Sequence, residues 1–522
     1  MAMEQEYLNF FSFQAKWNGD KEAIFDSDSG VRYTYRELDR RADRLARFLV
    51  HHLGLRRGDC VAFCACNSIA HYDMFYASWK TGIIITTYNH MLRSEEILRL
   101  MDQEQPKMLF YDVKLEERVE AWSRLPYLKA LCTLHGDPSR PGVWAYEELL
   151  EQGLPPLPSM QPEPEDCMMY IHTGGSTGLP KASMMSYRAV VSNCISEIIS
   201  FGLSYRDVGF QFLPLFHTGG WNVINLPLLF CGGKMVLKRD LDPGEIFRLL
   251  REERVTVGVS VPTIYSVLGS HPDFATADLS SLRWLIVGAA PVRQRTLEQF
   301  LSRGIKLCNS FGMTEAGPNN LSLPIDMIGV EDLRTRWNSV GKPMCLNDVQ
   351  IMDDAGAPVP PGENGELCFR GPLIFSGYLG REEETRNAWH DGWLHTGDIA
   401  REDEDGYLYV VGRKKNMIIV GGENVFPVEI EECITRFEGV REACVFGVPD
   451  DYWGEVPQAL VVAGDAPISL EELQTYLRKH LSGVKRPREI YFVDSIPRGS
   501  VGKVDYQKIH ELVQKLKEDY HE

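Results

Sequence analysis

Long apolar runs are missing from this sequence, in which no stretch reaches the ~18 residues that a membrane-spanning helix requires. Residues 1–17 also lack the basic segment followed by an apolar core that marks a secretion signal. The final tripeptide, Tyr520-His521-Glu522, is not a peroxisomal address. We therefore expect no transmembrane segment and a cytoplasmic location.

Positive charge is in deficit. The chain has 55 Lys and Arg residues against 73 Asp and Glu residues, which gives a formal net charge of −18. Such a chain repels the phosphate backbone of nucleic acids, which argues against a general nucleic-acid binder, although a local basic pocket for a small phosphate ligand stays open. The 522 residues predict about three domains at roughly 100 to 200 residues each.

Paired cysteines are absent as well. The closest cluster, Cys60, Cys64 and Cys66, has no Cys-x-x-Cys spacing and no partner pair downstream. This argues against a zinc or disulfide site, and most of the 12 cysteines stand singly in apolar runs, as small core residues do. A reducing compartment fits this usage.

Short apolar runs alternate with helical patterns along the first four hundred residues. Residues 60–64, 255–261, 284–287 and 305–308 are typical of buried strands, whereas 295–301 is typical of a helix. Thr34 and Glu37 have capping-box spacing ahead of a second helical pattern. This alternation predicts an α/β domain over residues 1–412, built from several subdomains with parallel-type sheets.

The pattern changes after Asp398, and we place a domain boundary at the polar stretch that begins with Arg413. Residues 413–522 suffice for a small α+β domain. One helix is predicted from Pro427. A second helix is predicted to start at Ser469, with Glu472 at capping-box spacing. Its leucines are expected to pack on strands; they are Leu470, Leu473, Leu477 and Leu481.

The most informative segment runs from Thr173 through Gly174, Gly175, Ser176, Thr177 and Gly178 to Lys181. Glycines allow backbone N–H groups to surround an anion, while hydroxyls and a lysine add donors, so the segment predicts a phosphate loop. It is not the Walker form, because Leu179 and Pro180 separate the last glycine from the lysine. A serine-hydrolase elbow around Ser176 and a plain surface turn remain alternatives.

The segment resembles the pyrophosphate-binding motif of the adenylate-forming superfamily, which includes acyl-CoA synthetases, luciferases and nonribosomal adenylation domains. Seven further blocks resemble family motifs in the same order and extend the resemblance over nearly the whole chain: Pro214-Leu215-Phe216-His217, Gly288-Ala289-Ala290-Pro291, Ser310-Phe311-Gly312-Met313-Thr314-Glu315, Trp393-Leu394-His395-Thr396-Gly397-Asp398, Gly412-Arg413, Gly421-Gly422-Glu423-Asn424 and Gly502-Lys503.

The resemblance implies a nucleotide site whose parts also make physical sense. Phe311 offers a flat apolar face for adenine, with Gly312 beside it, and the turn Gly288, Ala289, Ala290, Pro291 can approach the other side of the base. Thr314 can donate to the α-phosphate. Glu315 is the oxygen ligand that a magnesium ion bridging phosphates requires, although alone it could be a solvated loop carboxylate.

Asp398 is expected to accept hydrogen bonds from the ribose hydroxyls, with Arg413 as a charged donor, although Asp398 could also be only a turn residue. The family implies that Lys503 reaches the substrate carboxylate and the α-phosphate during adenylation. It also implies that the small domain rotates about a hinge at Lys415 and presents Gly421 and Gly422 to the pantetheine arm of coenzyme A. An ordinary β-turn explains the two glycines equally well.

The acid substrate is harder to identify. His217 and Trp221 resemble the carboxylate end and the gate of the acyl tunnel in fatty-acyl-CoA synthetases, although core packing explains both residues as well. The sequence departs from the common family pattern at Gly174, Ala182, Phe311 and Tyr506, where the family usually has serine, glycine, tyrosine and arginine. None of these changes removes an indispensable charge.

We therefore predict an ATP-dependent acyl-CoA synthetase that activates a medium- or long-chain fatty acid or an aryl acid. The acid becomes an acyl-AMP with release of pyrophosphate and then a CoA thioester. ATP, Mg²⁺ and coenzyme A are the expected cofactor and substrates. Transfer to a carrier-protein thiol and, from another class, a serine hydrolase using Ser176 are the alternatives. The oligomeric state is left open, with a homodimer as one arrangement.

Overall fold

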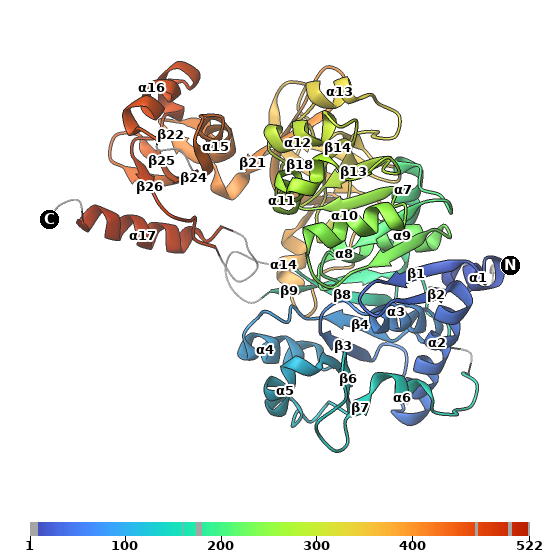
Figure 1. Ribbon diagram of the computed structural model, residues 1–522. Helices are drawn as coiled ribbons and strands as arrows, with labels where there is room; N and C mark the ends of the chain where they lie inside the picture. The colour runs from blue at the N-terminus through green and yellow to red at the C-terminus, as the bar shows by residue number, and fades with distance from the viewer. Residues whose placement is uncertain (1–8, 159, 174–179, 465–467, 499–503, 520–522) are drawn as a thin grey trace. The chain divides into compact units, whose positions relative to one another are not determined.

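The computed structural model describes residues 9–158, 160–173, 180–464, 468–498 and 504–519 (Figure 1). By its internal contacts the chain divides into two compact units. The first comprises Met1–Val349 and Phe369–Leu394, and the second comprises Gln350–Cys368 and His395–Glu522. The predicted domain boundary after residue 412 falls inside the second unit and stays a prediction.

Two large sheets form the first unit. The first sheet has seven strands in the order β7-β6-β5-β3-β4-β8-β9, which are parallel except for the antiparallel edge pair β8 and β9. Its strands are β3 (Cys60–Cys64), β4 (Ile84–Thr87), β5 (Met108–Asp112), β6 (Ala130–Leu134), β7 (Trp144–Ala145), β8 (Cys167–Thr173) and β9 (Lys181–Ser186). The helices interspersed with them are α2 (Tyr35–Arg47), α3 (Ile69–Thr81), α4 (Ser94–Glu104), α5 (Glu116–Trp122) and α6 (Tyr146–Leu150).

The second sheet has nine strands in the order β16-β15-β14-β13-β12-β10-β11-β1-β2, parallel from β14 to β1 and antiparallel at both edges. Its strands are β1 (Glu22–Asp26), β2 (Val31–Thr34), β10 (Val208–Gln211), β11 (Lys234–Leu237), β12 (Val257–Ser260), β13 (Trp284–Val287), β14 (Lys306–Phe311), β15 (Leu321–Ser322) and β16 (Lys342–Pro343). The remaining helices of this unit are α1 (Phe10–Trp17), α7 (Tyr187–Phe201), α8 (Thr218–Asn222), α9 (Asn225–Phe230), α10 (Pro243–Glu252), α11 (Pro262–Ser270), α12 (Gln294–Leu301), α13 (Val330–Thr335) and α14 (Glu382–Asn387).

The sequence patterns predicted these elements well. Cys60–Cys64 is a fully buried strand, and the strands and helix expected between residues 255 and 308 are β12, β13, α12 and β14. Thr34 caps α2 with both hydrogen bonds of a capping box to Glu37, so the predicted helix start is confirmed. Because parallel strands bring their carboxyl ends to one edge of a sheet, the loops after these strands are where ligands are expected to bind.

The chain passes between the two units within strands β17 (Asp348–Met352), β18 (Asn364–Arg370) and β20 (Trp393–Glu402). These strands belong to a five-stranded sheet in the order β17-β18-β20-β19, in which β21 also pairs with β20. The other two strands of this sheet are β19 (Trp389–His390) and β21 (Leu408–Arg413).

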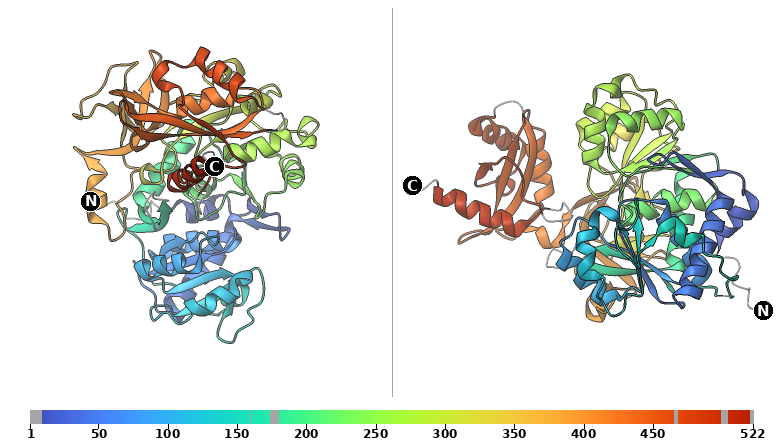
Figure 2. Two further views of the ribbon diagram at one scale, coloured as in Figure 1. Left: turned by 90° about the vertical axis from the view of Figure 1, so that its left-hand side faces the viewer. Right: turned by 60° about the horizontal axis from the view of Figure 1, so that its bottom comes forward.

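A second five-stranded sheet, in the order β23-β22-β25-β24 with β26 beside β25, forms the carboxyl-terminal part of the second unit. Side chains alternate along β25, so that Ala459 and Val461 pack with α15 and α16, whereas Leu460 and Val462 pack with α17. The red and orange helices and strands of this α+β arrangement are seen in two directions in Figure 2. Its elements are β22 (Ile418–Val420), β23 (Glu423–Val425), α15 (Pro427–Thr435), β24 (Val440–Asp450), β25 (Gly454–Ala463), α16 (Leu470–His480), β26 (Ile490–Phe492) and α17 (Tyr506–Asp519).

One packing prediction in this part is wrong. Ser469 caps α16 as expected, and Leu473, Leu477 and Leu481 are buried. Leu470, however, is 42% exposed. Leu470 is the first residue of α16, three positions before Leu473. At this end of the helix the Leu470 side chain does not face the sheet.

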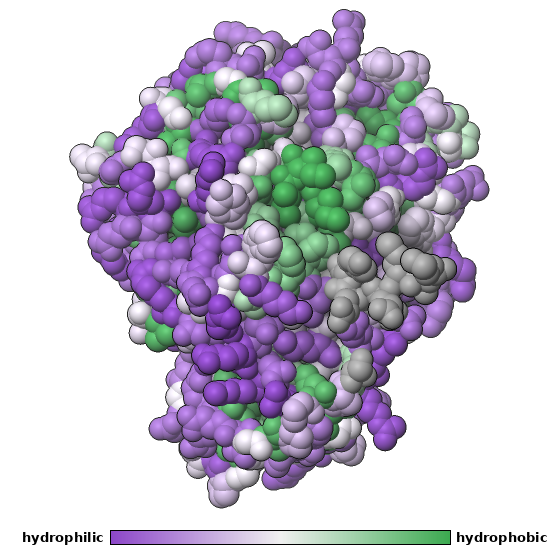
Figure 3. Space-filling model, turned by 90° about the vertical axis from the view of Figure 1, so that its right-hand side faces the viewer, coloured by the Kyte–Doolittle hydropathy of each residue, from purple (hydrophilic) through white to green (hydrophobic). Residues whose placement is uncertain are grey.

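The face seen in Figure 3 is mainly polar, with an apolar area near its centre. Single exposed apolar side chains such as Trp17 and Met327 are ordinary for a folded protein. Among the helices described, none is long and apolar enough to cross a membrane.

Candidate active site

The predicted phosphate loop connects β8 and β9, the antiparallel pair of strands at one edge of the first sheet. Thr173, the last residue of β8, lies opposite Lys181, the first residue of β9. The predicted residues Gly174, Gly175, Ser176, Thr177 and Gly178 lie outside the described residues, as does Lys503. A strand, rather than a helix, follows the loop, so the strand-turn-helix context of a serine-hydrolase elbow is not present around Ser176.

Lys181 is held in place by two side chains from a distant part of the chain. Its Nζ forms an ion pair with Glu384 at α14 and lies 5.0 Å from the centre of the Tyr378 ring. The same Tyr378 donates its hydroxyl proton to Oε1 of Glu315 at 2.7 Å. The structure therefore brings the predicted phosphate lysine and the predicted magnesium ligand to one tyrosine.

Glu315 is a buried carboxylate in a short 3-10 turn, Thr314–Ala316, with 7% of its surface exposed. Its backbone carbonyl accepts a hydrogen bond from the amide of Phe375 at 2.9 Å, which fixes the turn against the loop that carries Tyr378. A hard carboxylate oxygen of this kind suits Mg²⁺, which prefers one or two carboxylates together with phosphate oxygens and water.

The two sides of the predicted adenine site emerge from neighbouring parallel strands. The turn at Gly288 follows β13, and Phe311 ends β14, where Val287 lies opposite Asn309. The Asn309 side chain accepts from the amide of Val292 at 2.8 Å and thereby ties the turn to β14. The ends of β13 and β14 thus bring the Gly288 turn and the Phe311 ring to the same edge of the second sheet.

Backbone constraints act at both of these positions. Ala289 adopts a positive φ of 68°, and the amide of Ala290 donates to the carbonyl of Gly288, a tight turn that costs strain in a non-glycine residue. At Gly312 a Cβ atom would lie 2.1 Å from the carbonyl oxygen of Pro318, so the close backbone approach requires glycine.

The predicted ribose pair lies in the second unit. Asp398 on β20 and Arg413 on β21 occupy opposite positions of the two strands, and Arg413 Nε lies 2.7 Å from Asp398 Oδ1. Asp398 is 4% exposed. A carboxylate that pairs with an arginine through one oxygen suits the predicted role of accepting hydrogen bonds from hydroxyl groups.

The predicted hinge Lys415 is exposed in a short 3-10 turn, Lys414–Asn416. Glu366 contacts the same stretch, because its carboxylate accepts from the amide of Gly397 and pairs with Lys414 and His395. Burial alone would raise the pKa of Glu366, but the contacts with His395 and Lys414 lower it further than burial raises it. Sequence patterns gave no indication of this link.

Gly421 and Gly422 form the two-residue turn between β22 and β23, with φ angles of 59° and 87°. Two successive positive φ angles in a two-residue hairpin define a type I′ turn, which explains both glycines structurally. The amide of Gly421 also donates to the carbonyl of Trp453 at 2.7 Å.

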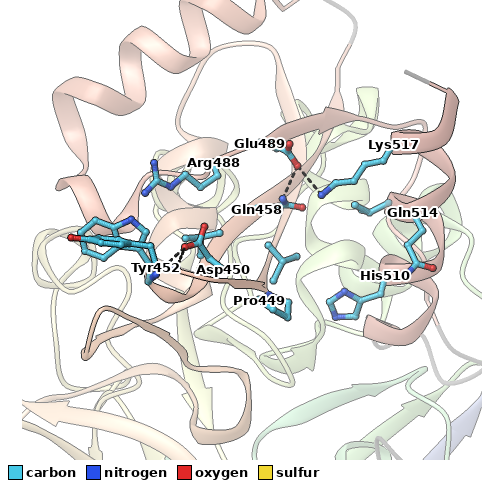
Figure 4. Close-up of a pocket in the computed structure, with 13 residues that line it drawn as sticks. Pro449, Asp450, Tyr452, Gln458, Arg488, Glu489, His510, Gln514 and Lys517 are labelled. Atoms are coloured by element: carbon cyan, nitrogen blue, oxygen red, sulfur yellow. Dashed lines mark hydrogen bonds and ion pairs between the residues drawn. The ribbon is translucent and has the colours of Figure 1, made fainter. Parts of the chain in front are cut away.

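Trp453 lines a cavity of about 620 Å³ in the second unit. Its wall combines the aromatic side chains of Tyr452 and Trp453 with Arg488, His510 and Lys517. Figure 4 shows Tyr452, Arg488, His510 and Lys517 around the cavity. Lys517 pairs with Glu489 at 3.1 Å, and Tyr452 is 84% exposed. The sequence analysis did not identify this cavity, because its wall comes from segments that are far apart in the sequence.

The two residues predicted for the acyl pocket differ in their surroundings. His217 is exposed at the start of α8, with its ring 4.7 Å from that of Phe216. Trp221 is 1% exposed, stacks on Phe75 and donates from its indole to the carbonyl of Leu215. This is well-packed geometry, and the gate remains a prediction.

Two protein-family models match the chain, and curated proteins and solved structures resemble it over most of its length. Residues 11–379 match the model of the family described as AMP-binding enzyme, and residues 429–503 match that of the AMP-binding enzyme C-terminal domain. The chain is 36% identical over 476 residues to a feruloyl-CoA synthase of Amycolatopsis sp, covering 91% of this chain and 93% of the relative.

It is also 30% identical over 488 residues to the long-chain-fatty-acid–CoA ligase FadD13 of Mycobacterium tuberculosis, covering 92% and 93% of the two chains. Among solved structures, ATP-bound MatB from Rhodopseudomonas palustris matches with a TM-score of 0.88 and 29% identity, covering 98% of this chain and 99% of that one.

The contact between Tyr378 and Glu315 can be tested by one substitution. Tyr378→Phe keeps the ring for Lys181 and removes only the hydrogen bond to the carboxylate. Since hydrogen bonds to charged groups contribute about 1.5–3 kcal/mol, we expect kcat/KM for ATP, measured by pyrophosphate release, to fall roughly tenfold or more.

The matched control is Tyr127→Phe. Tyr127 also donates its hydroxyl proton to a carboxylate, that of Asp102 on α4, at 2.8 Å. This contact is exposed. Its removal should leave kcat/KM unchanged. Equal values for the two variants would contradict the role given to Tyr378.

Proposed function

This chain belongs to the AMP-binding enzyme family, and from that premise we propose that its substrate is an aromatic carboxylic acid that carries a hydroxyl group. The enzyme is an AMP-forming acid–CoA ligase. It uses ATP to convert an acid into an acyl adenylate and passes the acyl group to the thiol of coenzyme A.

The site residues take the following roles in this proposal. Thr173 and Lys181 contact the outer phosphates, and Glu315 would hold a magnesium ion, which would offset the charge of these phosphates. Thr314 donates to the α-phosphate, while Phe311 and the turn at Gly288 enclose adenine. Asp398 and Arg413 bind the ribose, and Lys503 stabilises the charge that develops when the carboxylate attacks phosphorus.

The aromatic substrate class is supported first by the relatives. Feruloyl-CoA synthase, at 36% identity, is named for an aromatic acid, whereas FadD13, at 30%, is named for long-chain fatty acids. A medium- or long-chain fatty acid is therefore the second candidate.

A buried polar cluster next to α8 favours an acid with a hydroxyl group. The cluster consists of Asn193 and Glu197 on α7, Asn222 on α8 and Asn319, and each of these residues is at most 1% exposed. Asn193 Nδ2 donates to the carbonyl of Asn222 at 2.6 Å, and Asn319 Nδ2 donates to Glu197 Oε2 at 3.4 Å.

Within the described part of the chain, three oxygens of this cluster have no hydrogen-bond partner: Asn193 Oδ1, Glu197 Oε1 and Asn222 Oδ1. Burial raises the pKa of Glu197 well above its ordinary value, which favours the neutral acid. Leaving buried polar groups unpaired costs about 1–3 kcal/mol each. A substrate hydroxyl can both donate and accept, which matches this set better than an aliphatic chain does.

The alternatives have less support. The relatives are named CoA ligases, so transfer to a carrier-protein thiol is not favoured. The strand β9 that follows the loop argues against the hydrolase using Ser176.

We further propose that coenzyme A uses the cavity beside Trp453. Gly421 and Gly422 would admit the pantetheine arm, and the hydrogen bond from Gly421 to Trp453 joins this turn to the cavity wall. Aromatic faces can stack on adenine, and Arg488 and Lys517 can pair with phosphates. Rotation about Lys415 would bring this face to the adenylate.

The substrate class is tested by pyrophosphate release with ATP across matched acids, with and without coenzyme A. The panel pairs a 4-hydroxylated cinnamic acid with cinnamic acid itself and includes medium- and long-chain fatty acids. Because the acid without the hydroxyl leaves buried groups unpaired, we expect it to have a roughly tenfold or more lower kcat/KM. Glu197→Leu should reduce that preference. A fatty acid as the best substrate would contradict the proposal.

The coenzyme A site is tested with Arg488→Ala. Loss of a charge-assisted contact to phosphate should raise the KM for coenzyme A about tenfold, with the KM for ATP as the internal reference. Arg478→Ala removes an exposed arginine on α16 that does not line the cavity and serves as the control. If both variants have the wild-type KM for coenzyme A, the proposed coenzyme A site at this cavity is contradicted.

A further inference from the structure

His172, the residue before Thr173 on β8, forms a buried contact that the roles above do not use. Its Nε2 lies 2.6 Å from Oε1 of Glu104, and its Nδ1 lies 3.2 Å from the carbonyl oxygen of Thr87 on β4. The side chains are 8% and 0% exposed. Tyr88 donates its hydroxyl proton to the second oxygen of Glu104 at 2.9 Å.

The partners of the ring determine where its protons lie. A carbonyl oxygen only accepts, so Nδ1 of His172 carries a proton towards Thr87. The carboxylate of Glu104, which already accepts from Tyr88, is the acceptor for a second proton on Nε2. Both ring nitrogens therefore donate, and His172 is an imidazolium ion paired with Glu104.

Electrostatics agree with this assignment. Burial alone would lower the pKa of His172, but the charge of Glu104 and the hydrogen bonds to Glu104 and Thr87 raise it more. Glu104 is also the last residue of α4, so the imidazolium lies near the carboxyl end of a helix, where the helix dipole favours a cation.

The surrounding titratable groups do not interfere. Burial raises the pKa of each of the neighbouring tyrosines and thiols, so these groups stay neutral where His172 titrates; Cys60 lies on β3, Cys167 and Tyr170 lie on β8, and Tyr88 follows β4. Lys181, on the neighbouring strand β9, pairs with Glu384. Among the described residues, Glu104 is the charged group that acts on the pKa of His172.

The position of the pair links it to the phosphate site. His172 lies opposite Ala182 in the β8 and β9 pair, and the next pair along is Thr173 and Lys181. Loss of one ring proton would leave a lone pair facing an acceptor, either the Thr87 carbonyl oxygen at 3.2 Å or the Glu104 carboxylate oxygen at 2.6 Å, so the ring and the end of β8 would shift to relieve that contact. Thr173 would move with it.

We propose that His172 is a positioning residue for the adenylation step, whose ion pair with Glu104 holds the end of β8 so that Thr173 faces the nucleotide phosphates. The inference rests on the proposed phosphate-binding function of Thr173 and Lys181. The proposed role of His172 concerns the binding of ATP, so loss of the ion pair is expected to change KM rather than kcat.

The sign of the pH dependence follows from the raised pKa. The ion pair is complete below the ordinary histidine pKa of about 6.5 and is lost as the pH rises through the higher pKa of the folded protein. The KM for ATP should therefore be constant at low pH and increase along an alkaline limb, while kcat at saturating ATP changes less.

The test measures KM and kcat for ATP against pH in the wild type, Glu104→Gln and Tyr88→Phe. Without the carboxylate charge, Glu104→Gln should move the alkaline limb to lower pH by one unit or more. Tyr88→Phe removes a donor that stabilises the carboxylate, so the limb should stay or move slightly to higher pH.

A purely structural role of the pair would lower stability without moving the limb. A limb at the same pH in the wild type and in Glu104→Gln overturns the inference. If Glu104→Gln does not fold, a limb that moves to lower pH in Tyr88→Phe overturns it. Absence of pyrophosphate release from the wild type with every acid would instead refute the proposed function.

Discussion

The hydroxyl of Tyr378 donates to the buried carboxylate of Glu315 while Lys181 lies against the same ring, and the candidate site depends on this contact. Tyr378 thus contacts both the residue predicted to bind phosphate and the residue predicted to bind magnesium, and Glu384 pairs with the lysine. If the predicted roles hold, this contact positions both groups for a nucleotide in a chain that is acidic overall.

The other buried acids show how the surroundings assign the protonation state. Asp398 forms an ion pair with Arg413, whereas Glu197 accepts from an amide and burial raises its pKa, which favours the neutral acid. Glu104 faces an imidazolium. The same functional group can therefore serve as a ribose acceptor, as a neutral contact for a substrate hydroxyl or as an anchor for a strand.

Much of the fold was predictable because local patterns determine it. The apolar run from Cys60 to Cys64 and the capping box at Thr34 depend on neighbours within a few positions, and both predictions are confirmed. The α/β architecture follows from their alternation, and the ordered motifs indicated the family. The prediction that Leu470 packs on the sheet was wrong, because a helical pattern does not show where the first turn of the helix meets the sheet.

The contacts between distant segments could not be predicted in this way. No periodicity connects Tyr378 with Glu315, His172 with Glu104, or Gly421 with Trp453, because each pair meets only through the topology of the sheets and loops. The phosphate loop is predicted from its composition, but the strand that follows it was not predicted. The roles of the individual site residues stay predictions.

The most direct measurement follows the oxygen atoms of the acid. When a hydroxylated aromatic acid labelled with ¹⁸O in its carboxylate is incubated with the enzyme, ATP and coenzyme A, attack of the carboxylate on the α-phosphorus leaves one labelled oxygen in AMP. The account predicts this label in AMP and none in pyrophosphate. Label in a released phosphate, or unlabelled AMP alongside the acyl-CoA product, would contradict an acyl adenylate.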